Sequence, residues 1–284
     1  MKNIYYPYKA ELTKIKDETS NIKTFFLKLS QPLTFKGGQF MQLSAPGIGE
    51  APFTPSSEPG EVDEMTITIL KTGRITDYLH EKVKPGDILG LRGPFGHGYP
   101  THLFDGKTVL VIGGGVGLAP LRACLYALFG ECYDRVNRIS IKYGARSPYD
   151  LVFRDEYEEW AKKEKVDMSI SIDRPHPEWE KGAFKFDGVS QTVGLVTVLL
   201  DNLDVDIENT YAVSCGPEIM LKFVTYKLLD LGFKPEQIYL SMNRRMSCGV
   251  GKCHRCNIGP YYLCKDGPDM CYADIMNYDP FGSL

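Results

Sequence analysis

Four cysteines near the C-terminus, Cys248, Cys253, Cys256 and Cys264, are spaced as metal ligands often are, in the pattern C-x4-C-x2-C-x7-C. Thiolates bind both zinc and iron–sulfur clusters, and spacing helps to separate the two. A C-x4-C-x2-C start is the plant-type [2Fe–2S] spacing, whereas structural zinc usually takes paired C-x2-C or H-x3-H knuckles. Only Cys253 and Cys256 form such a pair. The spacing favours a [2Fe–2S] cluster, and structural zinc is the alternative.

The residues between these cysteines also suit a cluster. Gly249 and Gly251 allow a backbone that wraps the cluster and turns N–H groups towards its sulfides. His254 is a candidate zinc ligand, but we expect the loop to point it outward. Cys271 is expected to be an ordinary thiol and not a ligand. The first residues contain no apolar segment of the signal-peptide kind, so we expect a cytoplasmic protein, in which disulfides rarely persist.

A glycine-rich turn stands between an apolar run and a helical pattern in V-L-V-I-G-G-G-V-G-L-A-P. Its marked residues are Gly113, Gly114, Gly115, Gly117 and Pro120. Such a turn lets the backbone approach a pyrophosphate, and the helix that follows supplies free N–H groups and a positive dipole end. The turn therefore predicts dinucleotide binding, with a purely structural strand–helix turn as the alternative.

A second turn repeats this logic at Cys215, Gly216 and Pro217, after the apolar run T-Y-A-V-S. Ligands of open α/β sheets bind at the carboxyl ends of the strands, where both turns are expected to lie. After the next strand, Arg146 occupies the place where an acidic ribose ligand is common in NAD-binding proteins. It would favour NADPH if it faces a 2′-phosphate, and the alternative is a solvated loop arginine.

The remaining pattern divides the chain into three parts. Residues 1–102 read as short alternating strands with one helix at 75–83, which is typical of an antiparallel barrel or sandwich. Residues 103–243 alternate strands with helices, including helices expected at 151–164 and 196–203, which predicts a parallel sheet. Residues 244–284 show neither period and are too few to bury a core.

Composition excludes two other classes of protein. A net charge of −3 in 284 residues gives no basic surface for nucleic acid. No apolar run reaches the roughly 18 residues needed to span a bilayer. We therefore expect neither nucleic-acid binding nor membrane insertion.

Taken in order, these motifs resemble the ferredoxin–NADP⁺ reductase superfamily. The matching segments are the barrel-closing G-P-F-G at 93–96, the GGGxGxxP turn at 113–120 and the CGP turn at 215–217. The cysteine-rich tail is similar to that of sulfhydrogenase gamma subunits and the B subunit of anaerobic sulfite reductases, and more distantly to the electron-transfer subunit of dihydroorotate dehydrogenase. The resemblance implies an FAD-binding β-barrel domain (1–102), an NAD(P)-binding α/β domain (103–243) and a [2Fe–2S] module (244–284) held by the four cysteines.

The resemblance also implies a flavin site. The family's Arg-x-aromatic-Ser/Thr strand matches Ala51, Pro52, Phe53 and Thr54, in which the arginine is replaced by alanine. The second family segment comprises Ile69, Leu70, Lys71, Thr72, Gly73, Arg74, Ile75 and Thr76. Its glycine and helix start would present N–H groups to the pyrophosphate. We hypothesise that Arg74, or else Lys71, supplies the charge of the missing arginine. The alternative for Arg74 is a solvated turn residue.

The implied function is an NAD(P)H-dependent oxidoreductase subunit that carries electrons between NAD(P)H, FAD and a [2Fe–2S] cluster. Thr54 would approach flavin N5, and Cys215 would border the nicotinamide. The implied partners are catalytic and electron-transfer subunits of a hydrogenase, sulfur reductase or sulfite reductase. Two alternatives stay open: a free-standing NAD(P)H–flavin oxidoreductase with a zinc tail, and a redox sensor without turnover.

Overall fold

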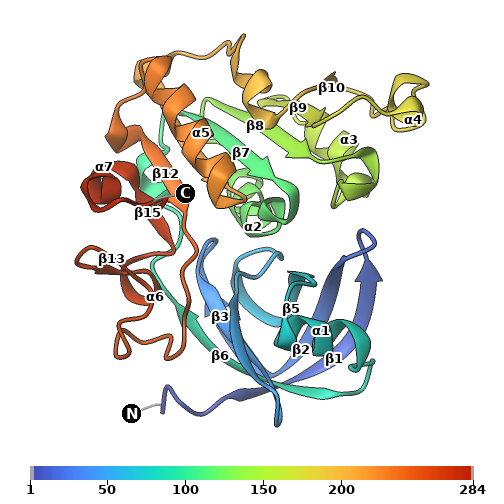
Figure 1. Ribbon diagram of the computed structural model, residues 1–284, viewed down its shortest axis with the longest axis vertical. Coiled ribbons are helices and arrows are strands. Elements are labelled where there is room, and N and C mark those ends of the chain that lie inside the picture. Colours follow the sequence, from blue (N-terminus) through green and yellow to red (C-terminus); the bar gives the residue numbers. More distant parts are fainter. Residues whose placement is uncertain (1–2, 283–284) are drawn as a thin grey trace.

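The first part of the chain forms an antiparallel barrel (Figure 1) in the computed structural model, which describes residues 3–282. Its strands lie in the order β4-β3-β6-β1-β2-β5. They are β1 (Tyr8–Asp17), β2 (Ile22–Phe35), β3 (Phe40–Ala45), β4 (Gly49–Phe53), β5 (Gly60–Leu70) and β6 (Ile88–Phe95). The edge strands meet where Pro55, just after β4, bridges Ile67 of β5.

Alternation along the strands places apolar side chains inside this barrel. In β1, Ala10 and Leu12 are fully buried while Glu11 between them is exposed. Helix α1 (Arg74–Glu81) follows β5 and buries Leu79 in the same core. The barrel prediction for the first hundred residues is therefore confirmed, and the expected helix is found within a residue or two of its predicted bounds.

The second part forms a mostly parallel sheet in the order β10-β9-β8-β7-β11-β12-β15. Its strands are β7 (Thr108–Gly114), β8 (Arg138–Ala145), β9 (Val166–Ile172), β10 (Val189–Val193), β11 (Thr210–Cys215), β12 (Ile238–Ser241) and β15 (Asp269–Cys271). Its longer helices are α2 (Leu118–Phe129) and α5 (Glu218–Asp230), and its shorter ones are α3 (Tyr157–Ala161) and α4 (Pro177–Glu180).

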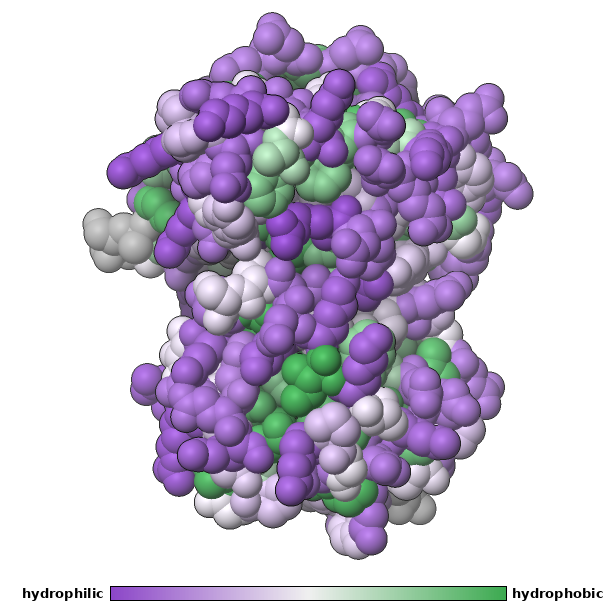
Figure 2. All heavy atoms as spheres, turned by 90° about the vertical axis from the view of Figure 1, so that its right-hand side faces the viewer, coloured by the Kyte–Doolittle hydropathy of each residue, from purple (hydrophilic) through white to green (hydrophobic). Residues whose placement is uncertain are grey.

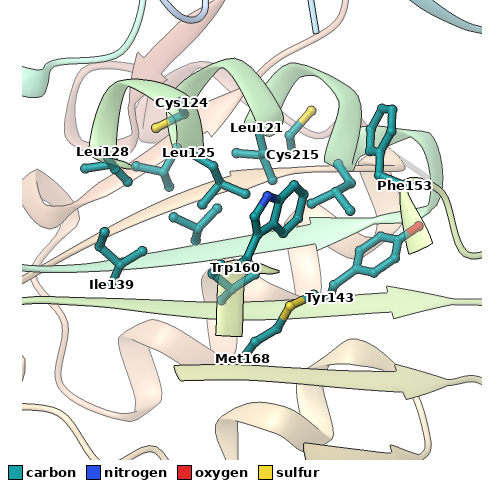
Figure 3. Packing of buried hydrophobic residues seen from close by; sticks show 14 of the residues in the cluster. Leu121, Cys124, Leu125, Leu128, Ile139, Tyr143, Phe153, Trp160, Met168 and Cys215 are labelled. Carbon is teal, nitrogen blue, oxygen red and sulfur yellow. The ribbon is translucent and has the colours of Figure 1, made fainter. Parts of the chain in front are cut away.

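Two apolar clusters cover the two faces of this sheet. In one of them, Leu121, Leu125 and Leu128 point from α2 towards the strands, with Trp160 of α3 packed beside them (Figure 3). The other cluster lies under α5 and continues into the C-terminal residues. A sheet covered on both faces explains why its strands are apolar runs without alternation.

Two expected helices are shorter than predicted. The helix expected at 151–164 is reduced to a 3₁₀ turn and α3, because Phe153 adopts a left-handed conformation with φ 58° and buries its ring. The Phe153 N–H donates to Glu18 of the barrel at 3.2 Å, so the chain first turns towards that lobe. The helix expected at 196–203 is a 3₁₀ helix, Val196–Leu200. Its β-branched residues Val196, Thr197 and Val198 disfavour the α-helix.

The C-terminal residues contain small elements: β13 (Asn257–Ile258), β14 (Tyr261–Tyr262), α6 (Leu263–Asp266) and α7 (Tyr272–Ile275). Their strand β15 pairs antiparallel with β12, Ser241 standing opposite Asp269. The cysteine-rich segment is thus joined to the edge of the nucleotide sheet and shares its core. Within residues 3–282, no helix has both the length and the apolar composition required to cross a bilayer.

Polar contacts, some of them partly buried, hold the two lobes together across the waist seen in Figure 2. Arg122 of α2 donates to the Ser56 carbonyl of the barrel at 2.7 Å and forms an ion pair with Glu156 at 2.6 Å. Lys16 of β1 binds Asp155 at 3.0 Å. These contacts fix the barrel against the carboxyl edge of the parallel sheet, where both glycine turns lie.

Candidate active site between the two lobes

A cavity of about 570 Å³ lies between the barrel and the parallel sheet. Its walls come from β4 and β5 of the barrel, from the two turns that follow β7 and β11, and from the segment after β12. A cavity at the carboxyl edge of a parallel sheet is the usual ligand site of such folds. The topology therefore assembles the site from segments that are far apart in the sequence.

Most of the site residues expected from the sequence line this cavity. They are Pro52, Phe53, Thr54, Ile69, Leu70, Thr76, Gly114, Gly115, Gly117, Pro120, Arg146, Cys215, Gly216 and Pro217. Five expected cofactor-binding residues stand outside its wall, namely Lys71, Gly73, Arg74, Ile75 and Gly113. Both glycine turns and the predicted flavin-binding strand of the barrel therefore line the same cavity.

The two turns abut because both lack side chains at the contact. Gly115 has φ +54°, a conformation that glycine adopts readily. A Cβ on Gly117 would overlap the carbonyl oxygen of Cys215. Helix α2 begins directly after the first turn and α5 directly after the second. Two helix N-termini, each a positive dipole end, therefore face the same cavity and make it suitable for phosphates.

Cys215 contributes a neutral thiol to this cavity. Only 8% of its surface is exposed, and burial raises the pKa of its thiol to about 12. The thiolate is the nucleophilic form of cysteine, so covalent chemistry is disfavoured here. Cys215 instead offers a small apolar surface at the cavity wall.

The cysteine loop adjoins the same cavity through the segment after β12. Met242, Asn243 and Met246 line the cavity, and the loop begins at Cys248, two residues later. Backbone N–H groups converge on its thiols. Val250, Lys252 and Cys253 donate to Cys248 Sγ at 3.2–3.4 Å, and Gly251 donates to Cys264 Sγ at 3.0 Å.

Known proteins resemble this chain in sequence. Residues 9–99 match the oxidoreductase FAD-binding domain family, and residues 111–226 match the oxidoreductase NAD-binding domain family. Sulfhydrogenase 2 subunit gamma of Pyrococcus furiosus is 38% identical over 97% of this chain and 98% of its own length. A probable dihydroorotate dehydrogenase B (NAD(+)) electron transfer subunit of the same organism is 34% identical over 90% of this chain and 87% of its own length.

The chain belongs to the ferredoxin–NADP⁺ reductase superfamily. Solved structures show the same fold. An NADH-dependent reduced ferredoxin-NADP oxidoreductase superposes with a TM-score of 0.71 at 24% identity, covering 95% of this chain and 92% of its own. A ferredoxin NADP+ reductase from Neisseria gonorrhoeae superposes with a TM-score of 0.69 at 21% identity, covering 82% of this chain and 96% of its own. The reductase is therefore an NAD(P)H-dependent flavin oxidoreductase.

The barrel side of the reductase cavity fits a flavin dinucleotide in part through α1. The Thr76 hydroxyl accepts hydrogen bonds from Thr72 N at 2.8 Å and Gly73 N at 2.9 Å. Those two N–H groups are therefore occupied, and the first-turn N–H groups from Arg74 onward remain for a phosphate. Thr76 acts as the cap that shapes this helix start, a role the sequence pattern did not indicate.

That Arg74 or Lys71 replaces the positive charge of the family arginine missing at Ala51 stays a prediction. Lys71 forms an ion pair with Glu81 at 2.6 Å, and both side chains are largely exposed, so its charge is already partnered. Arg74 is exposed at the first position of α1 and does not line the cavity. Among the cavity-lining residues of the described chain, the only Lys or Arg is Arg146. Arg74 is thus the cation nearest in sequence to the helix start that would hold the pyrophosphate.

Arg146 faces the cavity at the end of β8, with a carboxylate on the same wall at Asp150. Burial raises the pKa of nearby Asp173, and the charges of Arg146 and Arg174 oppose that rise. Arg146 is therefore one member of a mixed cluster of charges. Such a cluster offers partners both to a phosphate and to ribose hydroxyls, so both nucleotide alternatives stay open.

The cysteine loop fits a metal centre by the chemistry of its donors. Burial tends to raise the pKa of Cys248, but three N–H donors outweigh it and lower that pKa to about 6. Burial and the neighbouring Cys256 raise the pKa of Cys264 to about 12. In residues 3–282, no three His, Cys, Asp or Glu side chains are grouped closely enough to hold a metal ion. The thiols instead interact in two pairs, Cys248 with Cys253 and Cys256 with Cys264.

The other two residues weighed as ligands lie apart from this set. His254 is exposed and stacks on Tyr262 with ring centroids 4.7 Å apart, as expected for an outward side chain. The Cys271 thiol lies in β15 at 3.8 Å from the carbonyl oxygens of Pro235 and Glu236. Both positions agree with the predicted set of four cysteines, which remains a prediction.

Several residues of the site were not found from the sequence. Phe40, Ser241, Asn243, Asp150 and Pro268 line the cavity. They carry no motif, and only the fold brings them together. Ser241 and Asn243 end the last predicted strand, so the rule that ligands bind at carboxyl strand ends would have found these two.

Proposed function

We propose that this chain is the electron-transfer subunit of a multi-subunit reductase or hydrogenase, passing electrons between NAD(P)H, FAD and a [2Fe–2S] cluster. The observation that supports this most is the continuity between the two sites. The segment 242–246 lines the nucleotide cavity and leads directly into Cys248, whose thiol accepts three backbone N–H groups. N–H groups directed at thiolate sulfur are typical of iron–sulfur loops.

The chain's own residues bind and orient in this proposal. The turns at Gly115–Gly117 and Cys215–Pro217 would hold the nicotinamide dinucleotide, with Cys215 bordering its ring. Pro52, Phe53 and Thr54 would form the flavin wall, with the Thr54 hydroxyl near the hydride-accepting nitrogen. A bound flavin supplies the conversion between two-electron and one-electron transfer. Cys248, Cys253, Cys256 and Cys264 would hold the cluster.

The names of the relatives support a role as a subunit. One relative is called a sulfhydrogenase subunit gamma and another an electron transfer subunit, and both are matched along nearly their whole length. We therefore propose partner subunits that carry the terminal substrate site, of the sulfhydrogenase or anaerobic sulfite reductase type. We expect this chain to be located in the cytoplasm.

Metal analysis combined with electron paramagnetic resonance (EPR) of the reduced protein tests this function. We expect iron and acid-labile sulfide in equal amounts and a [2Fe–2S] signal. Cys256→Ser should lose most of the iron, whereas the control Cys271→Ser should keep it. Zinc in place of iron, or equal iron in both variants, would contradict the proposal. Zinc would instead indicate a free-standing NAD(P)H–flavin oxidoreductase.

Turnover separates the proposed function from a redox sensor. Steady NAD(P)H oxidation with an artificial acceptor such as ferricyanide is expected, because the intact glycine-rich turn makes a nucleotide site that a sensor does not need. A protein that is reduced once and does not turn over would contradict an enzymatic role.

A further inference from the structure

Gln42 of β3 carries a buried amide group without a partner. Its side chain is 1% exposed, and within residues 3–282 neither Nε2 nor Oε1 makes a hydrogen bond. Buried polar side chains are nearly always hydrogen-bonded, because leaving one unpaired costs free energy. The amide therefore calls for an acceptor that belongs to a bound group.

The position of Gln42 joins the cavity to the cysteine loop. It stands directly opposite Pro52 of β4 on one side and Arg92 of β6 on the other. Residues directly opposite in an antiparallel sheet project from the same face. Pro52 lines the nucleotide cavity, and Arg92 donates to the Cys248 carbonyl at 3.3 Å. The row Pro52–Gln42–Arg92 therefore runs from the cavity wall to the first cysteine.

Arg92 fixes the loop end of this row. Its guanidinium is bound to Glu50 through Nε at 3.0 Å and Nη2 at 2.5 Å, and Nη1 donates to the Ile4 carbonyl at 3.2 Å. The side chain is only 7% exposed and its charge is paired with that of Glu50. With these bonds and the bond to Cys248, Arg92 holds the backbone of the loop, and Gln42 is the member of the row that keeps free donors.

The Gln42 amide faces the loop and not the cavity. A Cβ placed on Gly249 would lie 3.2 Å from Gln42 Nε2, and Gly249 has φ +73°. The amide nitrogen thus packs against the residue that follows Cys248, where no side chain intervenes. Gln42 is not part of the cavity wall formed by the described residues, so a ligand in the cavity is not its natural acceptor.

We propose that the Gln42 amide N–H donates to a sulfur atom of the metal centre held by the cysteine loop, and that Gln42 is a positioning residue between that centre and the flavin wall. This inference rests on the proposed iron–sulfur function. The amide would complete the set of N–H donors that the backbone already directs at Cys248. Donors to cluster sulfur stabilise the more negative, reduced state and raise its potential.

The test is an anaerobic redox titration of the full chain followed by EPR. Gln42→Met keeps the length of the side chain and removes the donor, while Gln42→Glu keeps its shape and adds negative charge. For Gln42→Met we expect about a tenfold lower ratio of reduced to oxidised cluster at a fixed potential, which is about 59 mV for one electron. Gln42→Glu should shift the ratio in the same direction. Ser44→Ala, two residues along the same strand face, is the matched control and should leave it unchanged.

The outcomes distinguish this inference from the function on which it rests. An unchanged midpoint and EPR spectrum in Gln42→Met, with iron content intact, would overturn the role of Gln42 alone. A wild-type protein without an iron–sulfur signal would overturn the proposed function itself. If Gln42→Met fails to retain iron, the near-isosteric Gln42→Glu decides, and a wild-type midpoint in that variant refutes the inference.

Discussion

Asp269 of β15 provides a quantitative test of how the C-terminal segment packs against the rest of the chain. Its carboxyl group is buried against Gly38, and Ser241 stands opposite on β12. Burial raises its pKa from 3.8 to about 8. The Ser241 and Tyr99 hydroxyls are near enough to oppose that rise, although neither makes a hydrogen bond of standard geometry to it. Two buried thiols, Cys124 and Cys215, also lie within its electrostatic reach.

The sign of the effect follows from proton binding. In the unfolded chain this carboxyl group loses its proton near pH 4, whereas in the folded chain it keeps the proton until about pH 8. Between these values the unfolded state binds fewer protons, so stability falls as pH rises. A rise of about four pKa units corresponds to roughly 6 kcal/mol over the whole window. Asp269→Asn cannot ionise and should remove this fall.

Urea unfolding of wild type and Asp269→Asn, at several values between about pH 5 and pH 9, measures the difference. We expect the two proteins to be similar at the acid end and Asp269→Asn to be more stable at the alkaline end. Asp167→Asn is the matched control of opposite sign. Despite its burial, hydrogen bonds from Lys142 and Ser140 hold the pKa of Asp167 low. Its stabilising effect is therefore present at neutral pH and lost in acid.

Parallel stability curves for wild type and Asp269→Asn would refute the reasoning. They would mean that the carboxyl group is solvated or paired in the folded chain, and that β15 does not pack against β12 as described. A lower stability of Asp269→Asn at every pH would point instead to a packing or hydrogen-bonding contribution of the carboxyl group that does not depend on its ionisation.

The remaining predictions concern cofactor binding and the contact between the lobes. Arg74→Ala should lower FAD content markedly while Lys71→Ala does not, measured from the flavin absorbance per chain; equal occupancy would show that Arg74 is only a solvated residue. Gly117→Ala should weaken NAD(P)H binding at least tenfold, because the added Cβ would overlap the Cys215 carbonyl oxygen. Calorimetry of the flavin-loaded protein measures this affinity, and an unchanged value would contradict the prediction. Arg122→Gln should cost roughly 2 kcal/mol of stability, because it removes the cation that pairs with the partly buried Glu156 carboxylate. Denaturant unfolding at neutral pH that shows no loss of stability would contradict this.

The sequence was informative wherever one local rule decides the structure. Alternating apolar residues located the barrel strands, and apolar runs followed by glycine located the strands and turns of the nucleotide domain. These signals depend on near neighbours in the chain, so one sequence is enough. The turns at Gly115 and Cys215 were found in this way, and the fold then placed both of them at one cavity.

Tertiary contacts decided the features that the sequence did not show. Phe153 breaks an expected helix because its backbone meets Glu18 of the other lobe. The Thr76 hydroxyl caps the start of its own helix, besides lining the cavity. Gln42 and Asp269 acquire their properties from burial against segments that are distant in sequence. No local pattern marks such positions.

The central claim is that electrons pass from NAD(P)H through a flavin to an iron–sulfur cluster within one chain. An anaerobic visible spectrum of the purified protein, recorded before and after adding NADPH or NADH, tests it most directly. We expect a flavin band with a red-shifted iron–sulfur shoulder, both of which bleach with nucleotide. A flavin band without the shoulder would contradict the cluster, and a folded but colourless protein would contradict the whole account.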